Sequence, residues 1–265
     1  MMFRKFEFRY CLVFSILILV FFALVPSAHA GLILGAPKYV GLEKGLVGYW
    51  SFNGPDMAGN TAYDRALAPE AQNGTLTNGP VRTEGRIGQA LDFPASDDAV
   101  SVADTGELEP SSAVTMSVWT KPNVSAESQS CSNVIAGKEF ATPRASPFVS
   151  YTIGGCSGLA ARTFEFGISA ATVLTVMQTP SSKLEANTWV HLALTYNGAN
   201  MIGYVNGVNE ISAAKSGALD YSNGAFVIGA DGDLAENFNG VIDEVRIYNR
   251  ALSADEVKRL YNLGR

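Results

Sequence analysis

Asp243 is the residue whose type and position most clearly point to chemistry. It lies in the run Gly240–Tyr248, where apolar side chains alternate as in a β-strand. The alternation predicts that Asp243 shares a strand face with Val241, Val245 and Ile247, at the edge of a buried face. Because an unpaired buried charge is costly, this carboxylate needs a cation or several hydrogen-bond donors. Asp243 is therefore a candidate metal ligand, and its alternative role is an ordinary pairing with a basic side chain or with backbone amides.

Other reactive side chains are few. His191 lies inside the apolar run that begins at Trp189, which favours a structural imidazole over a catalytic one. Cys131 and Cys156 flank two strand-like runs that would form a hairpin, and an even pair in an exported chain is typical of a disulfide. Two free thiols are the alternative for this pair. The sequence lacks the Gly-x-Ser-x-Gly and His-Glu-x-x-His motifs and a phosphate-binding loop, which argues against several enzyme classes.

The first 30 residues have the pattern of a signal peptide. Arg4, Lys5 and Arg9 precede an apolar run over residues 11–25, and Ala28-His29-Ala30 offers a small-residue cleavage site. The alternative is an uncleaved membrane anchor, for which the run is short because a bilayer needs about 20 apolar residues. We therefore expect an exported protein, whether secreted, periplasmic or at the cell surface, with no membrane insertion after cleavage.

The rest of the chain has the size and composition of a single domain. The formal net charge of the full sequence, −6, argues against nucleic acid as a partner and is compatible with divalent cations. Residues 31–44 have no periodicity and are interpreted as a spacer. Residues 45–265 are long enough for one large all-β domain with a substantial core.

Short alternating runs separated by turn residues fill this domain, which predicts an all-β, two-sheet antiparallel sandwich. Asn206-Gly207 predicts a two-residue hairpin turn because both central positions need positive φ. Ser253 and Glu256 form a capping box that predicts a short C-terminal helix. Trp50 and Trp119 are expected in the core. The expected strands are 46–52, 89–93, 100–102, 114–121, 133–138, 148–153, 163–168, 173–178, 189–196, 201–205, 208–212, 226–229 and 240–248.

Five segments in order resemble the laminin-G-like jelly rolls of the concanavalin A-like lectin/glucanase superfamily. They are Leu46–Phe52, Gly85–Phe93, Val114–Pro122, Thr188–Asn197 with Gly203–Gly207, and Phe238–Leu252. The resemblance implies an antiparallel jelly-roll sandwich and a binding scaffold more than an enzyme. Because one fold hosts many functions, it predicts the fold more firmly than the ligand.

The resemblance also implies a structural calcium ion that ties the first strands to the last. Carried over to this sequence, its ligands are the Asp243 carboxylate, the Gly88 carbonyl and a group near Asn53. Calcium accepts carboxylate, carbonyl and water oxygens, so this set suits it, and a single carboxylate predicts weak affinity of about 0.1–1 mM.

An acidic run resembles a catalytic motif of some glycosidases in the same superfamily, which use Glu-x-Asp-x-x-Glu on a strand. Here Asp231, Asp233 and Glu236 form Asp-x-Asp-x-x-Glu, in a segment rich in Gly, Ala and Asn that is typical of a solvated loop. We therefore expect no catalytic residues. The rim loops that hold Asp231, Asp233, Tyr221 and Phe238 are candidate ligand contacts, and the two aromatic rings serve either as a stacking platform or as loop anchors.

Together these features predict an exported, non-catalytic, calcium-stabilised module that recognises a glycan or an extracellular protein. The alternatives are a structural or adhesive envelope protein without a small ligand, and a glycoside hydrolase.

Overall fold

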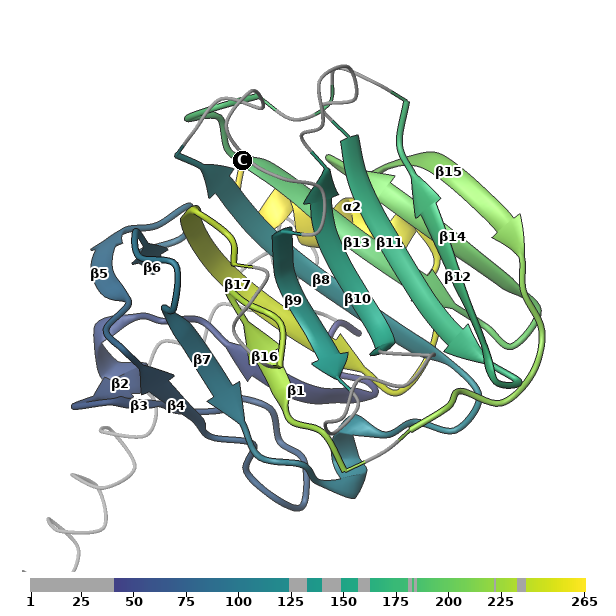
Figure 1. Cartoon of the computed structure of the whole chain (residues 1–265), viewed down its shortest axis with the longest axis horizontal. Helices are drawn as coiled ribbons and strands as arrows, with labels where there is room; N and C mark the ends of the chain where they lie inside the picture. The colour runs from purple at the N-terminus through teal and green to yellow at the C-terminus, as the bar shows by residue number, and fades with distance from the viewer. Residues whose placement is uncertain are drawn as a thin grey trace, which may run out of the picture. The chain divides into compact units, whose positions relative to one another are not determined.

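The alternating runs fold into two antiparallel β-sheets that face each other, with one helix at the C-terminus (Figure 1). The computed structural model describes residues 41–123, 133–139, 149–156, 163–180, 183, 185–221, 223–232 and 237–265. Residues 41–265 form one compact unit. The predicted signal peptide and residues 31–40 of the predicted spacer lie outside the described residues. Among the residues described, no helix is long and apolar enough to cross a membrane.

The first sheet, sheet A, has the closing strand near its middle. Strand β17 (Gly240–Tyr248) pairs with β8, β6 and β1. The order along the sheet is β15 (Val208–Ala214), β14 (Asn200–Val205), β13 (Val190–Tyr196), β8 (Val114–Pro122), β17, β6 (Gln89–Phe93) and β5 (Val81–Glu84), with β1 (Leu46–Trp50) beside β17.

The second sheet, sheet B, lies nearer the viewer in Figure 1. Its order is β12 (Val173–Gln178), β11 (Thr163–Ala170), β10 (Val149–Cys156), β9 (Asn133–Glu139), β16 (Phe226–Ile228), β7 (Ala99–Val102), β4 (Gly74–Thr77), β3 (Thr61–Ala62) and β2 (Met57–Ala58). Two short 3-10 helices, η1 (Gly54–Asp56) and η2 (Gly106–Leu108), connect strands.

The main core is made of apolar side chains from both sheets. Trp50 is fully buried and stacks on Phe226 from the opposite sheet, with ring centroids 5.3 Å apart. Trp119 is also buried, as predicted, but it lies on the other side of sheet A, where it stacks on Tyr261. Full burial of a large apolar side chain contributes about 1.5–3 kcal/mol, so these aromatic rings are major sources of stability.

Helix α2 (Ala254–Leu263) covers part of the outer face of sheet A. Ser253 accepts a hydrogen bond from the Glu256 backbone and Glu256 accepts one in return, which confirms the predicted capping box. Val257 and Leu260 pack in a second cluster with Tyr248 of β17. Leu42 is 4 % exposed and belongs to the same cluster. Residues 41–44, predicted as spacer, therefore belong to the domain.

The described strands confirm the predicted antiparallel jelly-roll sandwich. The predicted ranges 89–93, 173–178 and 240–248 agree with β6, β12 and β17, and the other predicted strands differ by a few residues at their ends. Asn206 and Gly207 have φ values of 52° and 76°, as the hairpin turn requires. Strands β2, β3, β4 and β5 were not predicted.

A β-bulge in β17 corrects the predicted face of Asp243. Opposite β8, the pairs Asp243–Trp119 and Arg246–Ser117 leave one extra residue on β17, and Glu244 has a φ of +56°. The extra residue reverses the alternation, so Val245 and Ile247 join Ile242 in the core between the sheets. Asp243 therefore does not share their face, as strict alternation predicted, but lies on the outer face of sheet A.

Candidate functional site

Asp243 has the unsatisfied oxygen that the metal hypothesis requires. Its side chain is fully buried. One carboxylate oxygen, Oδ2, accepts a hydrogen bond of 2.9 Å from the Ile87 backbone, while Oδ1 has no hydrogen-bond partner within the described part of the chain. Burial, and then the neighbouring charge of Glu244, raise the pKa of Asp243 to about 8. The ionised carboxylate is thus poorly stabilised by the protein alone.

The turn between β5 and β6, which holds Gly88, contacts both side chains predicted to bind calcium with it. Asn53 Oδ1 accepts a hydrogen bond of 2.8 Å from the Gln89 backbone. Gly88 has a φ of +71°, and a Cβ there would lie 2.0 Å from Asn53 Oδ1. On the other side of the turn, a Cβ on Gly85 would lie 2.7 Å from Asp243 Oδ2. The turn therefore passes between Asn53 and Asp243, in close contact with both.

The oxygens at this turn are of the types that a hard cation accepts. Asp243 Oδ1 has no hydrogen-bond partner among the residues that the structure describes, and the Gly88 carbonyl, which accepts one bond of 3.0 Å from Gly85 N, retains a second lone pair. Within the described ranges, no three or more His, Cys, Asp or Glu side chains gather as a metal site. A cation here would rely on one carboxylate, carbonyl oxygens and water, which are ligands that calcium accepts.

A buried ionic cluster fixes the bulge beside this site. The Tyr49 hydroxyl donates to both oxygens of Glu244, at 2.9 and 3.0 Å. Arg246 pairs with the same carboxylate, and its guanidinium lies 4.2 Å from the centroid of the Tyr49 ring. Because both charges are buried, each depends on the other and on Tyr49. The cluster explains how a glutamate keeps a positive φ at this position.

His191 is a structural residue, as predicted. It is 1 % exposed, and its Nε2 lies 2.9 Å from the Ser117 hydroxyl. Burial lowers the pKa of His191 to about 3, with a further contribution from Arg246. The ring lies against Trp119, with centroids 5.3 Å apart. A neutral, enclosed imidazole of this kind has no access to a substrate.

The predicted ligand contacts do not form a surface site among the described residues. Phe238 is 1 % exposed and belongs to the main core, so it is not available as a ligand contact, and of its two predicted roles the structure supports the anchor over the stacking platform. Tyr221 is half-buried, donates a hydrogen bond of 2.9 Å to the Pro110 carbonyl and packs against Tyr151, as a loop anchor does. Asp231 is 1 % exposed. Asp233 lies outside the described residues.

The predicted disulfide also falls largely outside the described part of the chain. Cys131 is not among the described residues, and for Cys156 the description stops at the backbone, at the end of β10. The Cys131–Cys156 pairing therefore stays a prediction. Glu236, the last acid of the glycosidase-like run, is likewise outside the description.

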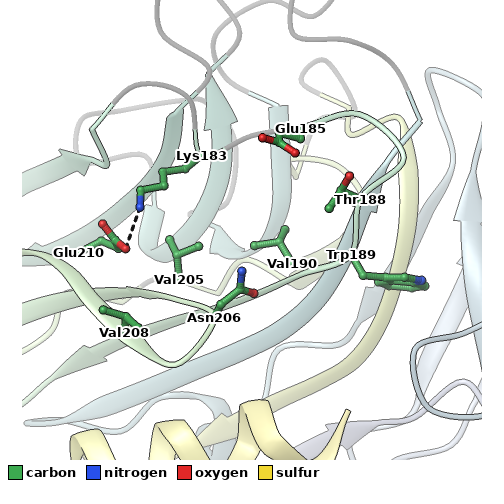
Figure 2. A pocket seen from close by; sticks show the side chains of 9 residues that line it. All are labelled: Lys183, Glu185, Thr188, Trp189, Val190, Val205, Asn206, Val208 and Glu210. Atoms are coloured by element: carbon green, nitrogen blue, oxygen red, sulfur yellow. Dashed lines mark hydrogen bonds and ion pairs between the residues drawn. The ribbon is translucent and has the colours of Figure 1, made fainter. Parts of the chain in front are cut away.

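A pocket that the sequence did not predict lies beside the hairpin of β14 and β15. Its volume is about 310 Å³. The segment that leads into β13 forms one wall and the β14–β15 hairpin forms the other (Figure 2). It is lined by Lys183, Glu185, Thr188, Trp189, Val190, Val205, Asn206, Val208 and Glu210.

The pocket combines an apolar floor with hydrogen-bonding walls. Val190 and Val205 are buried beneath it. Lys183 Nζ and Glu210 Oε1 pair across one side at 2.9 Å. Asn206 Oδ1 accepts a hydrogen bond of 3.0 Å from His191 N, which fixes the amide so that its Nδ2 points into the space above the two valines (Figure 2). Its donors and acceptors suit a small polar ligand.

Two facing antiparallel sheets define the architecture as a jelly-roll sandwich. The chain belongs to the concanavalin A-like lectin/glucanases superfamily, whose family model matches residues 94–258. No curated protein matches the sequence significantly.

Solved structures share the fold at low sequence identity. The binding domain of Paraclostridial mosquitocidal protein 1 is 17% identical with a TM-score of 0.65, over 84% of this chain and 53% of that one. Domain 4 of an extracellular GH43 arabinanase from Geobacillus stearothermophilus, solved with arabinotriose, is 21% identical with a TM-score of 0.60, over 82% and 98%. Trypanosoma rangeli sialidase with the inhibitor DANA is 15% identical with a TM-score of 0.57, over 81% and 32%. The chain thus spans about half of the mosquitocidal binding domain and nearly all of the arabinanase domain.

Proposed function

We propose that this protein is an exported, non-catalytic module that binds a glycan or an extracellular protein and is stabilised by calcium. The observation that carries the binding role is the open pocket with fixed hydrogen-bonding groups on a lectin-like sandwich. The arabinanase domain solved with arabinotriose and the mosquitocidal binding domain support this role because they have the same fold.

The pocket supports binding more than hydrolysis. A glycosidase needs a general acid, which is a carboxyl group kept protonated by apolar surroundings, opposite a second carboxylate. Glu185 is exposed, and Glu210 pairs with Lys183. Neither environment resembles that of a general acid. A structural or adhesive envelope protein without a small ligand is the competing function.

The calcium proposal rests on the unpartnered Oδ1 of buried Asp243. Asp243 and the Gly88 carbonyl would hold the ion, and Asn53 would hold the turn in place through its bond to Gln89 N. The ion would supply the positive charge that the buried carboxylate lacks. Its role is structural, since at 100 times its dissociation constant an ion adds about 2.7 kcal/mol of stability.

The proposed function is tested by applying the purified protein to a glycan array and incubating it with the same glycans in solution. We expect binding to at least one glycan class and no release of shortened products by mass spectrometry. Product release would identify a hydrolase. The absence of any glycan binding would leave only the extracellular-protein ligand or the adhesive role.

A further inference from the structure

We infer that the pocket between the residues that lead into β13 (183 and 185–190) and the β14–β15 hairpin binds an uncharged terminal sugar of a glycan. This inference rests on the proposed function and names the place and the chemistry of recognition. It is carried by the size of the pocket, its charge and the fixed Asn206 amide.

The size of the pocket limits the ligand to a chain end. About 310 Å³ is at the lower limit of small-molecule pockets, which range over about 300–1,000 Å³. Thr188, Glu185 and Val208 are exposed around it, so it opens to solvent, while Val190 and Val205 close its base. A single sugar ring can lie with its C–H face on the two valines and its hydroxyl groups toward the polar walls.

The charges of the pocket favour a neutral ligand. One ammonium, on Lys183, faces two carboxylates, on Glu185 and Glu210, which gives a formal charge of −1. The Lys183–Glu210 pair already places a donor beside an acceptor at 2.9 Å, an arrangement that matches two neighbouring hydroxyl groups of a sugar. An acidic sugar would bring its carboxylate toward two like charges, so sialic and uronic acids are disfavoured.

Asn206 supplies the fixed polar group that gives the pocket its specificity. Its position in the turn requires positive φ, and its Oδ1 is already engaged by His191 N. The remaining Nδ2 is a donor directed at the pocket, held before any ligand arrives (Figure 2). A preorganised donor avoids the entropy that a mobile side chain would lose on binding.

The test uses an array of neutral oligosaccharides that end in arabinose, galactose, glucose, mannose or N-acetylglucosamine, beside matched chains that end in sialic or glucuronic acid. Titration calorimetry then measures the affinity of the best-bound neutral oligosaccharide for three proteins, which are the wild type, Asn206→Asp and Glu210→Gln. Asn206→Asp retains the acceptor for His191 N and tolerates positive φ, so the turn is expected to fold. Glu165→Gln is the matched control, since this half-buried glutamate accepts a hydrogen bond from Gln178 on sheet B, outside the pocket.

We expect each pocket variant to weaken binding by about 10-fold or more, the effect of losing a hydrogen bond to a charged or fixed group, while Glu165→Gln binds as wild type. Wild-type affinity in both pocket variants would overturn the pocket inference and leave glycan binding at another site. Preference for the acidic glycans would also overturn it. If wild type binds no glycan, the inference fails together with the glycan part of the proposed function.

Discussion

Asp243→Asn removes the buried charge at the candidate calcium site while keeping the shape of the side chain. Without calcium, the folded-state pKa of Asp243 is about 8, above the ordinary value of 3.8. Between pH 3.8 and pH 8, Asp243 therefore keeps its proton in the folded protein but loses it in the unfolded chain. The contribution of Asp243 to stability must therefore fall as the pH rises from about 4 to about 8, and Asp243 costs roughly 5 kcal/mol at pH 8 relative to a pH below both values.

The substitution is therefore expected to stabilise the metal-free protein. The asparagine carries no charge, but one buried amide group remains unpaired, which costs about 1–3 kcal/mol. The difference predicts that Asp243→Asn is more stable than wild type by roughly 3 kcal/mol at pH 8. In a protein of this length that corresponds to a rise in melting temperature of about 6–12 °C.

Calcium should reduce this difference. At 100 times its dissociation constant it adds about 2.7 kcal/mol to wild type and nothing to the variant, because the variant lacks the carboxylate. The assay is thermal unfolding at pH 6.5 and pH 8, with chelator and with added calcium. A variant that is less stable than wild type in chelator at pH 8 would refute the reasoning, as would an equal response of both proteins to calcium.

Asp64→Asn is the matched control for this experiment. Asp64 Oδ1 accepts bonds from the Tyr49 and Ala66 backbone at 2.8 Å, and Oδ2 accepts one from Gln72 at 3.0 Å. Because both of its oxygens have donors, this substitution should destabilise the protein, by the same amount with and without calcium.

Three further predictions concern stability. Gly88→Ala should lower the free energy of unfolding by about 1–3 kcal/mol, because Gly88 has a positive φ and the added Cβ would collide with Asn53 Oδ1. Adding Asn53→Ala should recover part of this loss, as measured by urea unfolding. Ser253→Ala should cost about 1 kcal/mol by the same assay, and an unchanged midpoint would contradict the capping role. His191 has a pKa of about 3, below its ordinary 6.5, because it is buried in the neutral form. Its own contribution to stability should therefore rise with pH between these values, and His191→Gln should remove that contribution from the pH dependence. An unaltered pH dependence in the variant would mean that the ring is accessible to protons.

The sequence predicted those parts of the fold that depend on local pattern. A pattern of a few neighbouring residues is enough to recognise a long alternating strand, the Asn206-Gly207 turn or the Ser253 capping box. Strands β2 and β3 have two residues each, too few for a period of two to be visible. The bulge was missed because a glutamate with positive φ has no sequence signature, and Glu244 is held there by Tyr49, which is 195 residues away.

The candidate site was predicted only where resemblance supplied the positions. Asn53 and Asp243 both contact the turn that holds Gly88, although the assumed face of Asp243 was wrong, and the calcium site itself stays a prediction. The pocket was missed because its walls come from two segments that meet only in the folded chain. Trp189 gave a weak signal, since it was the one strand tryptophan not assigned to the core, and it lies at the pocket.

The place of β17 determines when this protein can fold. This strand occupies residues 240–248, yet it pairs with β1 at residues 46–50 and separates β8 from β6. Sheet A cannot close until nearly the whole chain has been synthesised, and such distant pairings form slowly. Until β17 has been made, its three pairing partners in sheet A each lack a neighbour, and these partners are β1, β6 and β8.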